Sequence, residues 1–214
     1  PKKLKEFESL LSRNRIFMDR TINVGPFSAE RALAYGFTGP NLRACGVDYD
    51  VRVMNPYSSY EELDFIVPIG QNGDTYDRFM VRQEEMWQSM SIIEQAIVKL
   101  EKLDDKETYF ANDPRFILPP KEKVYNNMEA LIWHFKIVMG ETDIPAGEVY
   151  HPIEAANGEL GFYLVSDGGR TPSRLHLRRP CFIYYQAYPE MVTGTMLSDA
   201  VLTMSSMNVI AGEL

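Results

Sequence analysis

The chain has 214 residues, 45% of them hydrophobic and 24% charged, which is enough apolar material for a folded domain with a real core. Its formal net charge of −8, with no dominant basic patch, argues against nucleic acid as a partner. The two cysteines form no CxxC pair and no apolar run approaches the length of a bilayer, so a disulfide framework, a zinc ribbon and a membrane-spanning helix are not expected.

Short helices and irregular segments are predicted for the first part of the chain. Residues 1–12 have the apolar spacing of a short amphipathic helix. Residues 13–24 are mixed in character and are predicted to be irregular. Ser28 is a good N-cap for a further helix, and Gly36 is a candidate for its C-terminal end.

The stretch from Gly36 to Arg52, GFTGPNLRACGVDYDVR, concentrates charges between turn residues. Arg43, Asp48, Asp50 and Arg52 could form a paired network near the core, because an arginine fork can bridge carboxylates. They could equally be the polar residues of a solvated loop. Spacing alone favours the solvated loop.

Two helices are predicted in the middle of the chain, after a short strand near Phe65. The longest runs from Asp77 to Leu103, with Asp74 or Asp77 as its cap. A second amphipathic helix runs from Val124 to Met139. An apolar stripe on the long helix is predicted to lie in the core; it comprises Phe79, Met86, Met90, Ile93, Ile97 and Leu100.

The hydrophobic period then changes from helical to alternating, which predicts a small antiparallel meander. Its three strands are predicted over Gly147–Ile153, Leu160–Ser166 and Ser173–Arg178. Asn157-Gly158 supplies the first hairpin turn. A final helix is expected from Gly194 to Ser205, followed by an apolar terminal segment that is expected to be tucked into the fold.

No sequence pattern for catalysis is present. The chain has neither a GxGxxG motif nor a P-loop, so binding of NADH or ATP is not expected. Cys45 and Cys181 lie far apart in the sequence and cannot supply the grouped thiolates of an iron–sulfur cluster by spacing. No Ser-His-Asp or Cys-His set stands out.

A series of motifs nevertheless resembles one known family in order and in register. The motifs are RNRIFMDRT (13–21), GFTGPNLRACGVDYDVR (36–52), GQNGDTYDR (70–78), IPAGEVY (144–150), NGELGFYLVSDG (157–168) and the closing GEL (212–214). They resemble the C-terminal half of the 49-kDa-type (D-type) subunit of respiratory complex I, the proton-pumping NADH:quinone oxidoreductase. The resemblance covers nearly the whole chain.

This resemblance implies an α+β fold that is mainly helical and similar to the large subunit of nickel–iron hydrogenases, with a small antiparallel sheet in the C-terminal half. It also implies that residues 1–214 form one domain, the C-terminal part of a larger subunit. The hydrogenases hold their metal with cysteines near the C-terminus, where this chain has Asn208 to Glu213 and no cysteine. No metal site and no catalytic residue are therefore assigned to the chain.

In this family the former metal cavity is the head-group end of a quinone pocket, beside a neighbouring subunit with the terminal iron–sulfur cluster. The closing motif places Asn208 and Ile210 as quinone-binding residues. Asn208 stands where the family has Asp, Ile210 where it has Val, and Ala211 where it has Phe. The implied partners are quinone and the B-type iron–sulfur, C-type peripheral-arm and H-type membrane-arm subunits, at the cytoplasmic face of the inner membrane.

Two other interpretations stay open from the sequence. The chain could be a scaffold that docks neighbouring subunits, because it has no convergent titratable cluster. It could also be a hydrogenase relative with its own metal, although the thiolate ligands are absent.

Overall fold

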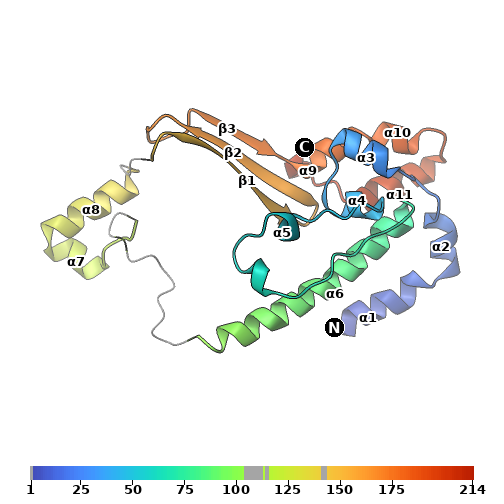
Figure 1. Ribbon diagram of the computed structural model, residues 1–214, viewed down its shortest axis with the longest axis horizontal. Coiled ribbons are helices and arrows are strands. Elements are labelled where there is room, and N and C mark those ends of the chain that lie inside the picture. Colours follow the sequence, from blue (N-terminus) through green and yellow to red (C-terminus); the bar gives the residue numbers. More distant parts are fainter. Residues whose placement is uncertain (1, 104–112, 114–115, 141–143) are drawn as a thin grey trace. The chain divides into compact units, whose positions relative to one another are not determined.

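The computed structural model describes residues 2–103, 113, 116–140 and 144–214, and it is mainly helical with one small antiparallel sheet, as predicted (Figure 1). In chain order the elements, with π- and 3-10 helices marked η, are α1 (Lys2–Phe7), η1 (Glu8–Ser12), α2 (Arg15–Thr21), α3 (Ala29–Tyr35), α4 (Gly39–Ala44), α5 (Val51–Met54), η2 (Tyr60–Glu62), α6 (Thr75–Leu100), α7 (Lys121–Asn126), α8 (Met128–Val138), β1 (Gly147–Ala155), β2 (Gly158–Ser166), β3 (Arg174–Arg178), α9 (Pro180–Tyr185), α10 (Tyr188–Val192), α11 (Leu197–Met207) and η3 (Ala211–Glu213).

The described chain divides into two compact units. The first comprises Pro1–Val98, Pro152–Gly161 and Arg178–Leu214 and contains the turn end of the β1–β2 hairpin. The second comprises Lys99–His151 and Phe162–Leu177 and contains α7, α8 and the open end of the hairpin. A single domain over residues 1–214 stays a prediction.

The three strands pair in the order β1-β2-β3, and the predicted meander is confirmed. The turn end of the β1–β2 hairpin is buried: Asn157 is 0% exposed and Glu159 is 8% exposed. This end meets the start of α4, where the Glu159 amide donates to Thr38 Oγ1 at 3.0 Å. The approach needs two glycines, because a Cβ added to Gly39 would lie 2.3 Å from the Cα of Gly158.

A buried arginine joins four segments of the first unit. Arg43 on α4 is 1% exposed, and its guanidinium donates to Glu85 Oε1 on α6 at 2.6 Å. It also donates to Glu154 Oε1 on β1 at 2.9 Å and to Asp50 Oδ2 before α5 at 3.3 Å. The paired network in this stretch is therefore present, and the solvated loop favoured by spacing is wrong. Of the charges considered, Asp48 is exposed.

Arg52 completes the network from the other side. It donates to Asp50 from Nε at 2.9 Å and from Nη2 at 2.6 Å. Burial acts against ionisation of Asp50, but the hydrogen bonds and charge of Arg52 prevail and lower its pKa. Burial raises the pKa of Glu154. The two guanidiniums thus hold buried carboxylates that would be costly if left unpaired.

Aromatic side chains fill the core beside this network. Phe27 and Phe37 stack with their ring centroids 5.2 Å apart, and Phe37 meets the ring of Tyr184 on α9 edge-on at 5.9 Å. All three side chains are at most 5% exposed. The core therefore ties the region around α3 and α4 to α9.

Two local predictions for the first unit are wrong. Residues 13–24 contain α2, whose N-cap is Asn14: its side chain accepts a hydrogen bond from the Ile16 amide. No strand forms near Phe65. The extended backbone there is satisfied by the long helix, since the Asp64 amide donates to Gln95 Oε1 at 2.9 Å.

The long helix is present as α6, and Asp74 caps it, since Asp74 Oδ1 accepts from the Asp77 amide at 2.8 Å. Its apolar stripe is not covered by described residues, contrary to prediction: Met86 is 44%, Ile93 57% and Leu100 64% exposed. The other predicted helix breaks at residue 127 into α7 and α8.

We expect Arg43→Met to destabilise the first unit by about 3–5 kcal/mol, because it leaves buried carboxylates without their partner. Urea unfolding of the purified chain measures this. Arg31→Met is the control, since Arg31 pairs with Glu190 at the exposed surface and its loss should change the midpoint little. Equal effects of the two substitutions would contradict the structural role given to Arg43.

We expect Gly39→Ala to cost at least about 3 kcal/mol, because a Cβ collides with the hairpin backbone and Gly39 has a φ of +66°. Gly140→Ala is a matched control: its φ is +70° and no atom lies within 4 Å of an added Cβ. Backbone strain alone should cost it about 1 kcal/mol. Thermal unfolding compares them, and a Gly39 variant as stable as the Gly140 variant would rule out the close approach.

Candidate functional site

The segment that follows α11 begins with a residue in the left-handed conformation. Asn208 has a φ of +57° and ends the helix, as asparagine can do at little cost. Its side chain is exposed and its Nδ2 donates to Asn157 Oδ1 at 2.6 Å. Asparagine can donate this bond, whereas an ionised aspartate at the same position could not.

The thiol of Cys181 lies beneath this segment at the start of α9. Its sulfur accepts from the Ile210 amide and from Asn157 Nδ2, each at 3.5 Å, and shares a hydrogen bond of 2.9 Å with the Tyr184 hydroxyl. It also donates to the Asn208 carbonyl at 3.8 Å. We call these five residues, Asn157, Cys181, Tyr184, Asn208 and Ile210, the Cys181 cluster.

Burial controls the protonation of the cluster. It raises the pKa of the Cys181 thiol, which is 0% exposed, and it raises the pKa of Tyr184. Both groups are therefore protonated at neutral pH. A protonated, fully buried thiol acts as a hydrogen-bonding and packing group and not as a nucleophile.

A cavity of about 400 Å³ lies within the first unit, between α2, α6 and α11. Its lining combines aromatic and aliphatic side chains with hydroxyl, amide and guanidinium groups; the residues are Phe17, Thr21, Thr75, Phe79, Arg82, Gln83, Met86, Leu202, Ser205, Ser206 and Asn208. Asn208 therefore joins the Cys181 cluster to the cavity. Ile210 does not line it: its side chain is 44% exposed elsewhere on the segment.

Arg82 is the cation of this cavity. Its guanidinium donates to the Ser206 carbonyl at 2.6 Å and to the Met207 carbonyl at 3.3 Å, so it holds the C-terminal end of α11. Burial lowers its pKa. Among the described residues, Arg82 Nε and Gln83 Nε2 are buried donors without a hydrogen-bond partner. Unmade hydrogen bonds of this kind are costly, which marks the lining as suited to an acceptor atom.

Arg78 lies one turn earlier on α6 and is also buried, at 1% exposure. It donates to the carbonyls of Gly73 and Gly25 and to the hydroxyls of Thr75 and Ser206. Burial lowers its pKa to about 10, so it is charged at neutral pH. The α6 face beside α11 thus carries two buried cations whose hydrogen bonds, in the described part of the chain, go to neutral oxygens.

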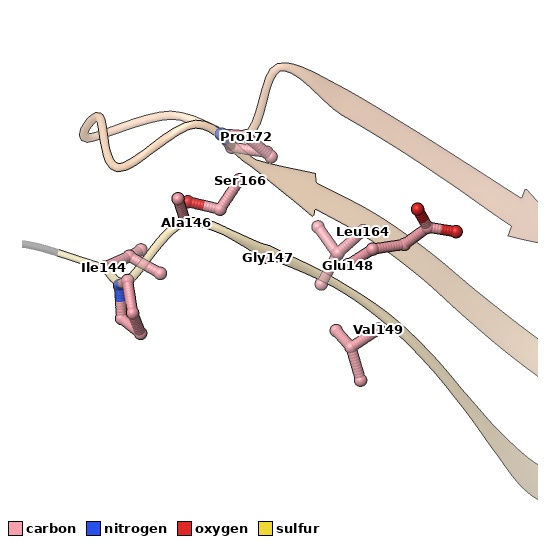
Figure 2. A pocket seen from close by; sticks show the side chains of 9 residues that line it. Ile144, Ala146, Gly147, Glu148, Val149, Leu164, Ser166 and Pro172 are labelled. Carbon is pink, nitrogen blue, oxygen red and sulfur yellow. The ribbon is translucent and has the colours of Figure 1, made fainter.

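Another cavity, of about 350 Å³, lies in the second unit at the open end of the hairpin (Figure 2). Its lining is almost wholly apolar, with Ile144, Val149 and Leu164 among its residues. Glu148 is its one titratable lining residue, and its carboxylate accepts from the Tyr163 hydroxyl at 2.6 Å. Figure 2 shows this carboxylate turned away from Ile144, so the cavity presents an apolar surface without a reactive group.

Within the described ranges, no three His, Cys, Asp or Glu side chains are grouped as a metal site would require. Cys45 and Cys181 are both buried free thiols. Burial raises the pKa of Cys45 to about 11, so it too is protonated. None of the helices described is long and apolar enough to cross a membrane.

Sequence reasoning identified Asn208 and Ile210 but not the groups that hold them. Asn157 was predicted only as a turn residue, and Tyr184 only as part of an aromatic run. Arg82 lies on the polar side of a helix whose apolar stripe dominated the pattern. The signal that was available is the Asn157-Gly158 pair, since a turn that must be buried needs a polar partner for its side chain.

Comparison with known proteins gives one family. The family described as "Respiratory-chain NADH dehydrogenase, 49 Kd subunit" matches residues 1–214. A match over the full chain agrees with the ordered series of sequence motifs.

Similar curated proteins carry related names, each that of a D-type subunit of NADH-quinone oxidoreductase. The second such protein of Cytophaga hutchinsonii is 72% identical over 214 residues, which is 100% of this chain and 54% of the relative. That of Flavobacterium johnsoniae is 66% identical over 100% of this chain and 51% of the relative. That of Myxococcus xanthus is 49% identical over 99% and 50%, respectively. The chain thus spans about half the length of the curated relatives it matches.

Proposed function

The chain belongs to the family of the 49-kDa subunit of respiratory-chain NADH dehydrogenase, and from this membership we propose that it forms part of the quinone-reducing module of NADH:quinone oxidoreductase. The relatives are named as subunits of an NADH-quinone oxidoreductase. In this proposal the chain contributes one wall of the quinone pocket, with Asn208 and Ile210 facing the quinone.

The observation that carries the proposal is the cavity between α2, α6 and α11, with Asn208 in its lining. A quinone has a flat apolar ring and two carbonyl acceptors. Phe17 and Phe79 offer apolar surface for the ring. The unpartnered nitrogens of Arg82 and Gln83 are donors suited to a carbonyl oxygen.

The groups of this chain would bind and orient the quinone and would not transfer electrons. An iron–sulfur cluster needs grouped thiolates, and Cys45 and Cys181 are separate, buried and protonated, so they do not fit one. We therefore propose that the electrons come from a cluster on the neighbouring B-type iron–sulfur subunit. The C-type and H-type subunits are the further proposed partners, with the chain peripheral to the cytoplasmic face of the inner membrane and the assembly acting as a proton translocase.

Asn208 would serve the pocket edge by a neutral hydrogen-bonding group. The resemblance places it where the family has Asp. Its amide is already bound to Asn157 Oδ1, so its position is defined from outside the cavity. A neutral residue here removes one negative charge that would otherwise attract Arg82.

A second function, the docking of neighbouring subunits, is favoured by a different observation. The exposed residues of α6 include Met86, Ile93, Ile97 and Leu100, an apolar stripe that described residues leave uncovered. Apolar stripes of this size on a helix are typical of contact surfaces. The chain could then support assembly while the chemistry depends on other groups.

We expect Asn208→Ala in the full-length subunit of the assembled enzyme to raise the KM for quinone about fivefold or more, with a smaller change in kcat, because a pocket group is lost. Steady-state oxidation of NADH with a short-chain quinone measures both. Val201→Ala is the control, since Val201 is 68% exposed on α11 and does not line the cavity.

Three outcomes separate the proposals. A raised KM only in the Asn208 variant supports the quinone pocket. An unchanged KM in fully assembled enzyme contradicts it. A smaller amount of assembled complex on native gels, with unchanged KM in what assembles, favours the docking function.

A further inference from the structure

The Cys181 cluster is more polar than a buried cysteine normally requires. A free buried cysteine usually packs as a small hydrophobe. Cys45 is an example: its thiol donates to the Asn41 carbonyl one turn back on its own helix. The sulfur of Cys181 instead meets polar atoms from the β1–β2 turn, from α9 and from the segment after α11.

This cluster is the main long-range anchor of the segment after α11. Among the described residues, the long-range hydrogen bonds of residues 208–213 go to Asn157 and Cys181: Asn208 bonds to both, Ile210 bonds to the sulfur, and Glu213 Oε2 accepts from the Cys181 amide at 3.3 Å. The other backbone hydrogen bonds of this segment are local. Without the cluster, the segment would be held mainly through its neighbours in sequence.

The anchor is itself rigid. Asn157 and Cys181 are both 0% exposed, and Tyr184 is a fully buried core residue that packs against Phe37. The Asn157 turn is pressed against α4 by the close approach of Gly39 and Gly158. A group held on several sides in this way can define the position of whatever it binds.

We propose that Cys181, with Tyr184 and Asn157, is a positioning group for the quinone pocket: it fixes the backbone of residues 208–210 so that Asn208 lies at the edge of the cavity. This inference rests on the proposed function of Asn208 and adds the groups that make it effective. Cys181 does not touch the quinone and takes no part in electron transfer. It acts through hydrogen bonds to the Asn208 carbonyl and the Ile210 amide.

The test uses Cys181→Ala and Cys181→Ser in the full-length subunit of the assembled enzyme. We expect Cys181→Ala to raise the KM for a short-chain quinone about five- to tenfold and to leave kcat within about twofold. Cys181→Ser keeps a group that can donate and accept, and should restore the KM to within about twofold of the parent. Cys45→Ala is the matched control, a buried thiol outside the cluster, and should leave the KM unchanged.

A second measurement reports the position of the segment directly. Hydrogen exchange of the assembled enzyme, followed by mass spectrometry, should show about fivefold faster exchange in the peptide that carries the Ile210 amide when Cys181 is replaced by Ala. Cys45→Ala should not change it. If Cys181→Ala does not assemble, Tyr184→Phe decides, since it removes one hydroxyl from the cluster and keeps the ring.

The outcomes distinguish this inference from the function on which it rests. If Asn208→Ala raises the KM and neither Cys181→Ala nor Tyr184→Phe does, the positioning role is wrong and the proposed function stands. If Asn208→Ala leaves the KM unchanged, the proposed function itself fails. If Cys181→Ser behaves like Cys181→Ala, hydrogen bonding by the side chain is not what matters and the inference is overturned.

Discussion

The first unit depends on the buried guanidinium of Arg43 and the carboxylates around it. An arginine at 1% exposure is stable only if its charge is matched, and Glu85, Glu154 and Asp50 supply the match from α6, β1 and the turn before α5. Because these groups come from distant parts of the sequence, their pairing fixes α4 against the long helix and brings the turn end of the hairpin to it.

That constraint reaches the candidate site through the hairpin turn. Glu154 is held by Arg43, and three residues later Asn157 is buried where it can accept from Asn208. Arg82 holds the other side of the same segment by the carbonyls at the end of α11. The edge of the cavity is therefore fixed from the sheet and from the long helix, which suits a site that orients a ligand and does no covalent chemistry.

The sequence alone was sufficient for the elements with a strong period or a clear turn. The long helix, its Asp74 cap and the three strands follow from spacing, and the family resemblance follows from ordered motifs. The Arg43 network could not be derived from spacing, because its strongest partners are 42 and 111 residues away. The same holds for the contacts of Cys181, which join residues 24 to 29 positions away. Long-range polar pairing leaves no periodic signal, whereas helical and alternating burial do.

The most direct test of the account is photoaffinity labelling of the intact enzyme with an azido-quinone, followed by mass spectrometry of the labelled peptides. The account predicts that label displaced by excess quinone is found in the peptide containing Asn208, with further label on the α6 peptide containing Phe79. Displaceable label confined to other subunits, or to other parts of this one, would contradict the assignment of a quinone pocket to this chain.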